Sequence, residues 1–574
     1  MSIHDQNYSS KDIHRLNCID SVPLIRHIII NKNNVKDTTR ETVLIEFRNL
    51  PHLEFLIKNT IIKLPTWNHT IVCGNLNNKM INQICSDLQV NIIQLNIDNL
   101  TPSQYSHLLM TRDFWERFQG DKILIYQEDS MLFHGEISEF LEYDYIGAAW
   151  PIGQDDNLLG VGNGGFSLRT RKKMIECIEK INPLTDLQIG NSTLSYMRAT
   201  RSNCLPEDVF FSKALIDHEL GKVATRDVAN IFSQETQACI NPLGGHNFWL
   251  ARNNKTFYSN FVLENEYYNC VKHRGGWKTI ISQLINKGIV KSIPNNNSVK
   301  FIDCIESRFS NWSSNQTPMI EPWVGIFHYS PNLPYFIRDD LNYILNNQLV
   351  LQSLPYCKGI IVLSNNSLKH IKMNNNYKNI NVKLLHHPIE EITGKFSLEN
   401  FLQKKNYYVI QLGLQDRKIT TIYKINTKYK KIWLPGRDTA LSYLRNEIHN
   451  LKIQINLEDV ELKYFNEHKE FDSIIQNNIV IIPLWSASAN NSVMEIIEMN
   501  IPAFITRLPA TEEYLGKNYP MFYNEECEIE EIINDREKLH AKVSETYYYL
   551  TQIDKGKFRF DYFNSELLRF IFSL

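Results

Sequence analysis

The stretch Lys122-Ile-Leu-Ile-Tyr-Gln-Glu-Asp-Ser130 changes abruptly from apolar to polar. Its apolar part, Ile123–Tyr126, is typical of a short strand that is buried on both faces. In an open α/β sheet, ligands bind just beyond the carboxyl ends of the strands, and Glu128 and Asp129 follow at that point. Two adjacent carboxylates there could hold a hard divalent cation, which in turn could hold a diphosphate. The alternative is that Asp129 or Ser130 caps a following helix, and this segment alone favours neither interpretation.

Predicted strands and helices alternate on both sides of this stretch. Short apolar runs indicate strands at 43–48, 67–72 and 122–126, and a helical pattern of apolar residues covers 53–62. A further helix and strand are predicted within 81–95. Such alternation is typical of α/β proteins with a parallel, Rossmann-like sheet. Residues 1–40 are polar with no sustained period, and we expect them to form a loose N-terminal extension.

Length, charge and cysteine content narrow the class of protein. The chain has 574 residues, which favours about three to five domains. It carries 61 basic and 63 acidic residues, a net charge of −2, and no basic tract, so nucleic acid and anionic membranes are not expected partners. The ten cysteines include no C-x-x-C pair, which indicates a reducing compartment rather than a zinc site. No secretory signal or membrane-spanning run is visible, so a soluble, cytoplasmic protein is expected.

Two motifs follow the predicted strand end. In Gly162-Asn-Gly-Gly165, the glycines allow the backbone to bend tightly and to approach a ligand closely, although most glycine clusters are turns. Further on, Pro206 opens a predicted helix with Glu207 and Asp208 in its first turn. The helix dipole favours acidic residues at that position whatever their function, so a purely capping role is the alternative to a chemical one.

The order of these parts carries a resemblance to a known family. The matching segments are Glu46-Phe-Arg48, Phe114-Trp115, Ile125-Tyr-Gln-Glu-Asp-Ser130, Tyr143-Asp-Tyr-Ile-Gly147 with Trp150, Gly162-Asn-Gly-Gly-Phe-Ser-Leu-Arg169, Glu207-Asp-Val-Phe-Phe211, and His246 with Trp249. Together, over residues 41–250, they resemble a poorly characterised family of GT-A-like glycosyltransferases. That family usually has Gln-Thr-Asp where this chain has Gln127-Glu128-Asp129; the aspartate is retained and a carboxylate is added.

The resemblance implies an enzyme that uses a nucleotide-diphosphosugar donor. Asp129, with Glu128 and His246, would coordinate Mn²⁺ or Mg²⁺, and the metal would act as a Lewis acid for the leaving nucleoside diphosphate. For His246, a structural role beside aromatic residues is the alternative. The donor would be bound by Glu46, Arg48, Asn163, Gly164 and Gly165.

The same resemblance places the acid–base chemistry at Glu207 and Asp208, after the glycine-rich loop. Asp208 would be the catalytic base of an inverting reaction and would take the proton from the acceptor hydroxyl. A physical objection is that a helix N-terminus lowers the pKa of a carboxylate and so weakens it as a base.

The second half of the sequence repeats the alternation of strands and helices. Strands are predicted at 323–330, 357–364, 382–388, 407–412 and 478–485, with helices at 276–285 and 493–498, and a new domain is predicted to begin at 299–304. The predicted domains are therefore the extension 1–40, a GT-A-like domain 41–256, and two Rossmann-like lobes, 257–393 and 394–574. These two lobes resemble a GT-B glycosyltransferase of the group 1-like type, with acceptor binding in the first lobe and donor binding in the second.

This second resemblance implies a donor site without a metal ion. Glu495 would bond the donor ribose, and Arg417 with Lys418 would hold the diphosphate, assisted by a helix N-terminus near Asn491. A solvated Arg417–Lys418 pair is the alternative. Eight residues before Glu495 the chain has Ala487, where many retaining enzymes have glutamate, so their mechanism is not carried over.

Three hypotheses about function remain. The first is a bifunctional glycosyltransferase that moves sugars from nucleotide-diphosphosugar donors to a glycan or another hydroxyl acceptor. In the second, one half is a non-catalytic module that binds a glycan or a partner, and Ala487 makes the C-terminal half the candidate. The third is a nucleotide-sugar enzyme that is not a transferase, such as a two-lobed epimerase. His328 could face the sugar in the second half, or could be a local hydrogen-bonding partner.

Overall fold

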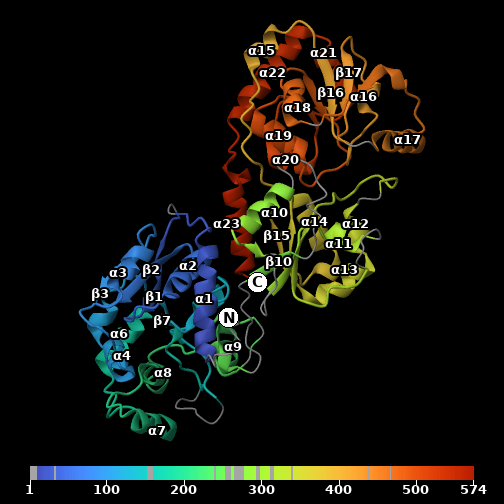
Figure 1. The fold of residues 1–574 in the computed structure, drawn as a ribbon. Coiled ribbons are helices and arrows are strands. Elements are labelled where there is room, and N and C mark those ends of the chain that lie inside the picture. Colours follow the sequence, from blue (N-terminus) through green and yellow to red (C-terminus); the bar gives the residue numbers. More distant parts are fainter. Residues whose placement is uncertain are drawn as a thin grey trace, which may run out of the picture. The chain divides into compact units, whose positions relative to one another are not determined.

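The structure is a computed structural model, and its chain forms two compact units, Met1–Ser259 with Ile571–Ser573, and Asn260–Phe570 (Figure 1). It describes residues 9–573 except 32–33, 152–158, 238, 240, 252–259, 264–276, 292–297, 311–315, 338–339, 437–438 and 466. The predicted boundary between residues 256 and 257 lies outside the described residues.

The first unit is built on a six-stranded sheet in the order β3-β2-β1-β4-β7-β6. Its strands are β1 (Asp37–Ile45), β2 (Trp67–Cys73), β3 (Asn91–Gln94), β4 (Lys122–Tyr126), β6 (Tyr145–Ile146) and β7 (Phe166–Thr170). The first four pair in parallel, as predicted. The last two do not, because β7 runs antiparallel to β4 and β6 runs antiparallel to β7.

The chain leaves β4 into a second strand and not into a helix. Ser130 begins β5 (Ser130–Leu132), which pairs with β9 (Gly244–His246); β9 also pairs with β8 (Ser233–Gln234). The alternative in which Asp129 or Ser130 caps a following helix is therefore wrong. The antiparallel register places Ser130 opposite His246, and this pairing brings the end of the unit back to the carboxyl end of β4.

Helix α1 (Ser10–Ile25) occupies 16 residues of the predicted extension 1–40, so the prediction of a loose segment was wrong over these residues. Its buried side chains include Cys18, Ser21, Leu24 and Ile25, which form a narrow face toward the unit. The remaining surface of the helix is mostly polar, apart from the exposed Ile13 and Leu16, and part of it pairs with buried acids. Sequence periodicity counts only the apolar face, which here is too short to be recognised.

Other helices complete the first unit, and the predictions at 53–62, within 81–95 and after Pro206 each correspond to one of these helices. They are α2 (Leu53–Lys63), α3 (Asn78–Ile84), α4 (Pro102–Leu109), α5 (Arg112–Trp115), α6 (Arg171–Lys180), α7 (Asn191–Thr200), α8 (Glu207–Asp217) and α9 (Arg226–Phe232). The predicted opening of α8 is confirmed, with Pro206 at its N-cap position.

The second unit contains two six-stranded sheets in which each pair of neighbouring strands is parallel. The first has the order β11-β10-β12-β13-β14-β15 and the second β18-β17-β16-β19-β20-β21. The strands of the first are β10 (Asn260–Leu263), β11 (Val290–Lys291), β12 (Ser298–Ile302), β13 (Trp323–Phe327), β14 (Cys357–Val362) and β15 (Val382–Leu384). Those of the second are β16 (Tyr408–Leu412), β17 (Lys430–Leu434), β18 (Val460–Leu462), β19 (Ile479–Ile482), β20 (Ala503–Thr506) and β21 (Phe522–Tyr523). The α/β prediction is confirmed.

Helices flank these two sheets (Figure 1). They are α10 (Trp277–Asn286), α11 (Ile305–Phe309), α12 (Leu341–Leu345), α13 (Gln348–Ser353), α14 (Asn365–Met373), α15 (Leu398–Gln403), α16 (Thr421–Lys424), α17 (Ala440–Leu451), α18 (His468–Ile475), α19 (Asn491–Met499), α20 (Pro509–Leu515), α21 (Glu526–Ile533), α22 (Arg536–Thr551) and α23 (Phe560–Ile571). Within the part of the chain that the structure describes, no helix is both long and apolar enough to cross a membrane.

Candidate functional site

The acids at the carboxyl end of β4 are covered by positively charged side chains. Glu128 and Asp129 expose only 2% and 12% of their side chains. Lys11 on α1 bridges them, because its Nζ lies 2.7 Å from Glu128 Oε1 and 2.6 Å from Asp129 Oδ2. Arg15, four residues later on the same helix, donates to both oxygens of Glu128 at 2.7 and 3.1 Å.

Two residues that follow β1 complete the surroundings of Glu128. The Arg48 guanidinium lies 3.3 Å from Glu128 Oε1 and also donates to both oxygens of Glu46. His52 Nε2 lies 3.2 Å from Glu128 Oε2 and 3.0 Å from the Glu128 carbonyl oxygen. The sequence predicted Glu46 and Arg48 as donor-binding residues, and the structure brings Arg48 into contact with Glu128 and holds Glu46 beside it through Arg48.

These contacts govern the charges of the two acids. Burial alone would raise both pKa values, but hydrogen bonds from His52, Arg15 and Lys11 hold the pKa of Glu128 well below its usual range. Contacts with His246 and Lys11 do the same for the pKa of Asp129. Both carboxylates are therefore ionised at neutral pH and balanced by fixed cations.

His246 forms the other wall of the acid site. Its Nε2 lies 3.4 Å from Asp129 Oδ1 and its Nδ1 lies 3.1 Å from Glu235 Oε1. Burial lowers the pKa of His246, but the contacts with Asp129 and Glu235 outweigh burial and raise that pKa to about 9. The ring is thus an imidazolium at neutral pH and donates toward both carboxylates.

The predicted Mn²⁺ or Mg²⁺ ion does not fit these side chains as they are arranged. Metal-binding histidine is neutral and metal-binding carboxylates offer free lone pairs, whereas His246 is protonated and Glu128 is enclosed by cations. In favour of an ion, Asp129 Oδ1 is buried and accepts no hydrogen bond from the described residues, but it lies 3.4 Å from the protonated ring of His246. Within the same residues, no group of three or more His, Cys, Asp and Glu side chains has a metal-binding arrangement. The metal site at Glu128, Asp129 and His246 stays a prediction.

The glycine-rich loop packs directly against His246 and accepts a hydrogen bond from Ser130, which follows the two acids. Asn163 has a left-handed φ of 63°, and its Oδ1 accepts a hydrogen bond from the backbone N–H of Gly165 at 3.1 Å. A Cβ added to Gly165 would lie 2.4 Å from His246 Cδ2, so glycine is required for this close approach. The Asn163 side-chain amide donates to Glu235, and Glu235 in turn contacts His246.

Glu207 and Asp208 take different positions at the start of α8. Glu207 forms a buried ion pair with Arg169 on β7, with 2.5 Å between Arg169 Nη1 and Glu207 Oε2. The Arg169 guanidinium also lies over the rings of Tyr145 and Phe211, at 5.0 and 5.7 Å from their centroids. Glu207 therefore fixes the loop and helix in place, which argues against the direct catalytic role predicted for it.

Asp208 is half-buried and remains chemically available. Its Oδ2 accepts a hydrogen bond of 3.1 Å from the backbone N–H of Asn163. Burial raises the pKa of Asp208, and the neighbouring negative charge of Glu207 raises it further, to about 6. The direction of this shift is opposite to the lowering expected for a carboxylate at a helix N-terminus, and it favours Asp208 as a base.

One chain of polar contacts joins seven of the ten predicted site residues of the first unit. It runs from Asp208 through Asn163, Glu235, His246, Asp129, Lys11, Glu128 and Arg48 to Glu46. Sequence reasoning missed Lys11, Arg15, His52, Arg169 and Glu235. A basic pair at four-residue spacing directly after Ser9, which caps α1, was the available signal for Lys11 and Arg15.

The second predicted site centres on the loop that precedes α19. Arg417 is buried and donates to the carbonyl oxygens of Leu412 and Gln415 at 2.8 and 2.9 Å. It also donates to Asn490 Oδ1 and Ser492 Oγ, both at 3.1 Å. Burial lowers the pKa of Arg417 to about 10. These bonds show that Arg417 holds the loop, and they correct the solvated-pair alternative for this residue.

The other predicted donor residues surround the same helix start. Lys418 is half-buried, with its Nζ 5.2 Å from the centroid of the Trp485 ring. Asn491 is the first residue of α19 and Asn490 is its cap, accepting from the backbone N–H of Val493. Glu495 lies one turn further along α19 and is half-buried.

His328, on the other lobe, has a structural role. Its Nε2 lies 2.7 Å from the Asp303 carbonyl oxygen, and its backbone N–H donates to Glu306 at 2.6 Å. Burial lowers the pKa of His328 to about 4, so the ring is neutral. The local hydrogen-bonding interpretation is confirmed for this residue.

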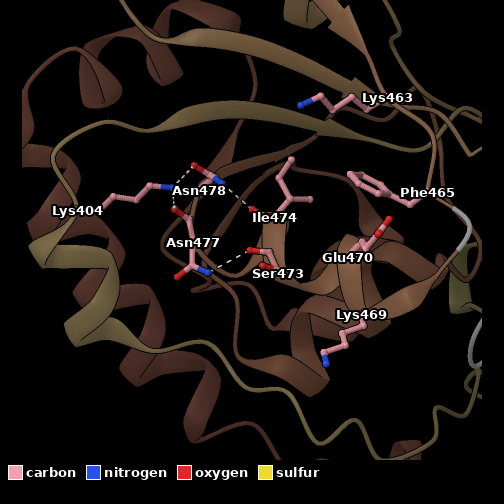
Figure 2. Close-up of a pocket in the computed structure, with 9 residues that line it drawn as sticks. All are labelled: Lys404, Lys463, Phe465, Lys469, Glu470, Ser473, Ile474, Asn477 and Asn478. Atoms are coloured by element: carbon pink, nitrogen blue, oxygen red, sulfur yellow. Dashed lines mark hydrogen bonds between the residues drawn. The ribbon is translucent and has the colours of Figure 1, made fainter.

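A hollow of about 880 Å³ lies elsewhere on the second unit (Figure 2). It is lined by Lys404, Lys463, Phe465, Lys469, Glu470, Ser473, Ile474, Asn477 and Asn478. Asn478 directly precedes β19 and Lys404 lies shortly before β16, so the hollow is near the amino ends of these strands. Ligands of such sheets bind at the carboxyl ends, and Lys404 is already bonded to Asn477 and Asn478. We therefore do not assign the donor to this hollow.

Comparison with known sequences gives a family without an assigned activity. Residues 89–246 match a family described as proteins of unknown function, DUF5672. The matched segment contains β4, the glycine-rich loop, Asp208 and His246, and it excludes α1 and the whole second unit. No curated protein matches the chain.

Solved structures with partial likeness were also found. HepE of Anabaena, solved with UDP-glucose, is 12% identical, with a TM-score of 0.37 over 54% of this chain and 97% of its own. A TarM mutant of S. aureus, solved with fondaparinux, α-GlcNAc-glycerol and UDP, is 11% identical with a TM-score of 0.34. That match covers 51% of this chain and 58% of TarM. The pneumococcal O-GlcNAc transferase GtfA, solved with UDP and GlcNAc, is 14% identical with a TM-score of 0.30 over 44% of this chain and 52% of its own. Because these TM-scores are below 0.5, the fold rests on the sheet topology described above.

Proposed function

We propose that the first unit is a GT-A-like glycosyltransferase that uses a nucleotide-diphosphosugar donor. The observation that carries this proposal is the continuous chain of polar contacts from Asp208 to Glu46 at the carboxyl end of β4. It joins a glycine-rich loop, a carboxylate with a raised pKa and a cluster of cations in one site. Such a combination suits an anionic donor beside a base.

In the proposed reaction, Asp208 takes the proton from an acceptor hydroxyl. The hydroxyl oxygen forms a bond to the anomeric carbon of the donor sugar as the bond to the diphosphate oxygen breaks. The nucleoside diphosphate leaves with that electron pair, and the configuration at the anomeric carbon inverts. The acceptor is proposed to be a glycan or another hydroxyl compound. The cations Lys11, Arg15 and Arg48 lie where the charge of the leaving diphosphate can be stabilised.

For the second unit we propose a GT-B-like transferase with a donor site at the start of α19. Support comes from two parallel-sheet lobes and from the placement of Arg417, Lys418 and Glu495 around one helix N-terminus. Helix N-termini bind diphosphates well. The chain would then be bifunctional and would add two sugars.

A non-catalytic second unit is the alternative. Ala487 is buried and offers no carboxylate at the position where many retaining enzymes have one. Arg417 is committed to holding the loop, so the site has fewer free charges than the sequence indicated. In this alternative, the second unit binds a glycan or a partner while the first unit performs the only transfer.

A screen of nucleotide sugars against the full chain tests these proposals. Nucleotide release should be observed with at least one donor, and Asp208→Asn should reduce release by the first unit. Release that survives Asp208→Asn but is lost in Glu495→Ala would support a second active unit. If no donor gives release above background, the glycosyltransferase proposal is wrong. If Asp208→Asn abolishes all release, the binding-module alternative for the second unit is favoured.

A further inference from the structure

Helix α1 places two cations over the acids at the end of β4, and together they carry the charge of one divalent metal ion. Lys11 bridges Glu128 and Asp129 at 2.7 and 2.6 Å, and Arg15 lies on the same helix face at 2.7 Å from Glu128. We propose that Lys11 and Arg15 take the place of a divalent cation, so that the first unit binds the donor diphosphate without a metal ion. This inference rests on the proposed function of that unit.

The contacts around Glu128 leave little capacity for a metal ion. Its Oε1 lies within 3.3 Å of nitrogens from Lys11, Arg15 and Arg48, and its Oε2 lies within 3.2 Å of nitrogens from Arg15 and His52. A carboxylate offers about four lone-pair sites, and these five contacts already use them. A divalent cation would therefore have to displace Lys11 and Arg15 before it could reach Glu128.

The cationic side chains of this site are more exposed than Glu128, which favours the binding of an anion. Side-chain exposure is 34% for Lys11, 25% for Arg15 and 43% for Arg48, whereas it is 2% for Glu128. The acids thus lie beneath the cations, and the partly exposed nitrogens form the outer layer. Arginine guanidinium groups can bind phosphate through two parallel hydrogen bonds, which suits them to a diphosphate.

Helix α1 is fixed to the unit at several points along its length. Arg26, which follows its last turn, forms two hydrogen bonds of 2.6 Å with Glu54 on α2. In its first half, the ring of His14 packs against Phe248 and Trp249 at 5.3 and 5.1 Å between centroids. These contacts indicate that α1 is a permanent part of the site. They argue against a helix that moves away when a metal ion binds.

Manganese binding to the full chain tests the inference directly. The wild-type protein is expected to show no Mn²⁺ binding that depends on Asp129, as judged by equilibrium dialysis against Asp129→Asn. The double variant Lys11→Met/Arg15→Met leaves the acids uncovered and should bind Mn²⁺ at least tenfold more tightly than the wild type. Addition of Asp129→Asn to the double variant should remove the gain.

Binding of inorganic pyrophosphate in excess chelator gives the second measurement. The wild type should bind it, and the double variant should bind at least tenfold more weakly. The matched control Lys79→Met/Lys172→Met removes the same charge from exposed positions of the first unit and should change the affinity less than twofold. Any contribution of the second unit is common to all variants.

Three outcomes would overturn the inference: Asp129-dependent Mn²⁺ binding by the wild type, pyrophosphate binding that the double substitution leaves unchanged, or a folded double variant that gains no Mn²⁺. If circular dichroism shows that the double variant is unfolded, the single variant Lys11→Gln is measured in its place. It should also bind Mn²⁺ more tightly and pyrophosphate more weakly than the wild type. Neither measurement uses a sugar donor, so failure of the glycosyltransferase proposal would leave these results interpretable.

Discussion

The backbone N–H of Asn163 donates a hydrogen bond of 3.1 Å to Oδ2 of Asp208. This bond joins the glycine-rich loop to the first turn of α8, although the two residues are 45 positions apart in the sequence. Displacement of Asn163 would therefore change the hydrogen bonding of the proposed base. The same loop also contacts His246 through Gly165.

Asp208→Asn should strongly slow transfer by the first unit without affecting its fold. Loss of a general base reduces the rate by about 10²- to 10⁴-fold, whereas the amide retains the shape and can still accept from Asn163. The measurement is kcat for nucleotide release, with thermal denaturation as the check on folding. An Asp208→Asn enzyme that retains more than half of the first unit's rate would remove Asp208 from the mechanism.

The activity of the first unit should rise with pH through about 6. The proposed base works only when ionised, and burial with Glu207 raises the pKa of Asp208 to about 6. Below that pH the carboxyl is protonated, so kcat/KM should fall as pH decreases, and above it the rate should level off. A pH profile of kcat/KM checks this. The residual rate of Asp208→Asn serves as the control and should show no such step.

Arg169→Gln should strongly destabilise the first unit. The substitution leaves Glu207 buried without its partner, and breaking a buried ion pair in this way costs about 3–5 kcal/mol. Arg112→Gln is the matched control, because Arg112 is 55% exposed in its pair with Glu116, and such surface pairs contribute about 0–1 kcal/mol. The free energy of unfolding, followed by a probe in the first unit, should separate the two variants clearly. Equal effects would show that the Arg169–Glu207 pair has no special structural role.

Gly165→Ala should weaken both the stability and the ligand binding of the first unit. The added methyl group would overlap the His246 ring, and overpacking of this kind costs about 1–3 kcal/mol. Gly556→Ala in the second unit is the control, because an added Cβ there meets only the Asp554 side chain, at 3.0 Å. Thermal denaturation and pyrophosphate titration measure the two effects. A Gly165→Ala protein with unchanged behaviour would contradict the close approach of the loop to His246.

Arg417→Met and Lys418→Met should have different effects on the second unit. Arg417 makes four hydrogen bonds to the loops around it, so its loss should lower the unfolding midpoint of that unit. Lys418 lies over the Trp485 ring, and its loss should weaken anion binding while leaving the midpoint nearly unchanged. Differential scanning calorimetry and pyrophosphate titration distinguish the two. If both variants lose only anion binding, the structural role of Arg417 is wrong.

Much of the fold follows from local patterns in the sequence. Apolar runs such as Ile123–Tyr126 and Ile479–Ile482 identify buried strands, because a strand that is buried on both faces has apolar residues at consecutive positions. The direction of a strand is not encoded in that way. Phe166–Thr170 has a strand pattern, but its antiparallel pairing with β4 depends on the long connection that precedes it.

The candidate site was predicted only where its residues lie in motifs. Asp129, Asn163, Asp208 and His246 were found through their local context, and the structure brings them into one network of contacts. Lys11 and Arg15 were missed because their role depends on partners more than 110 positions away. Arg169 was present in a recognised motif, yet its pairing with Glu207 is a tertiary contact that no local pattern reports.

The long sequence separation between α1 and β4 also bears on how the protein should be divided and how it is made. Lys11 and Asp129 are 118 residues apart, so during synthesis the acids of β4 emerge long after the helix that neutralises them. An expressed fragment that starts at residue 41 would lack α1 and the first four residues of β1. Two ionised carboxylates would then face water without their amino-terminal counter-charges, and such a fragment would report on a different site from that of the full chain.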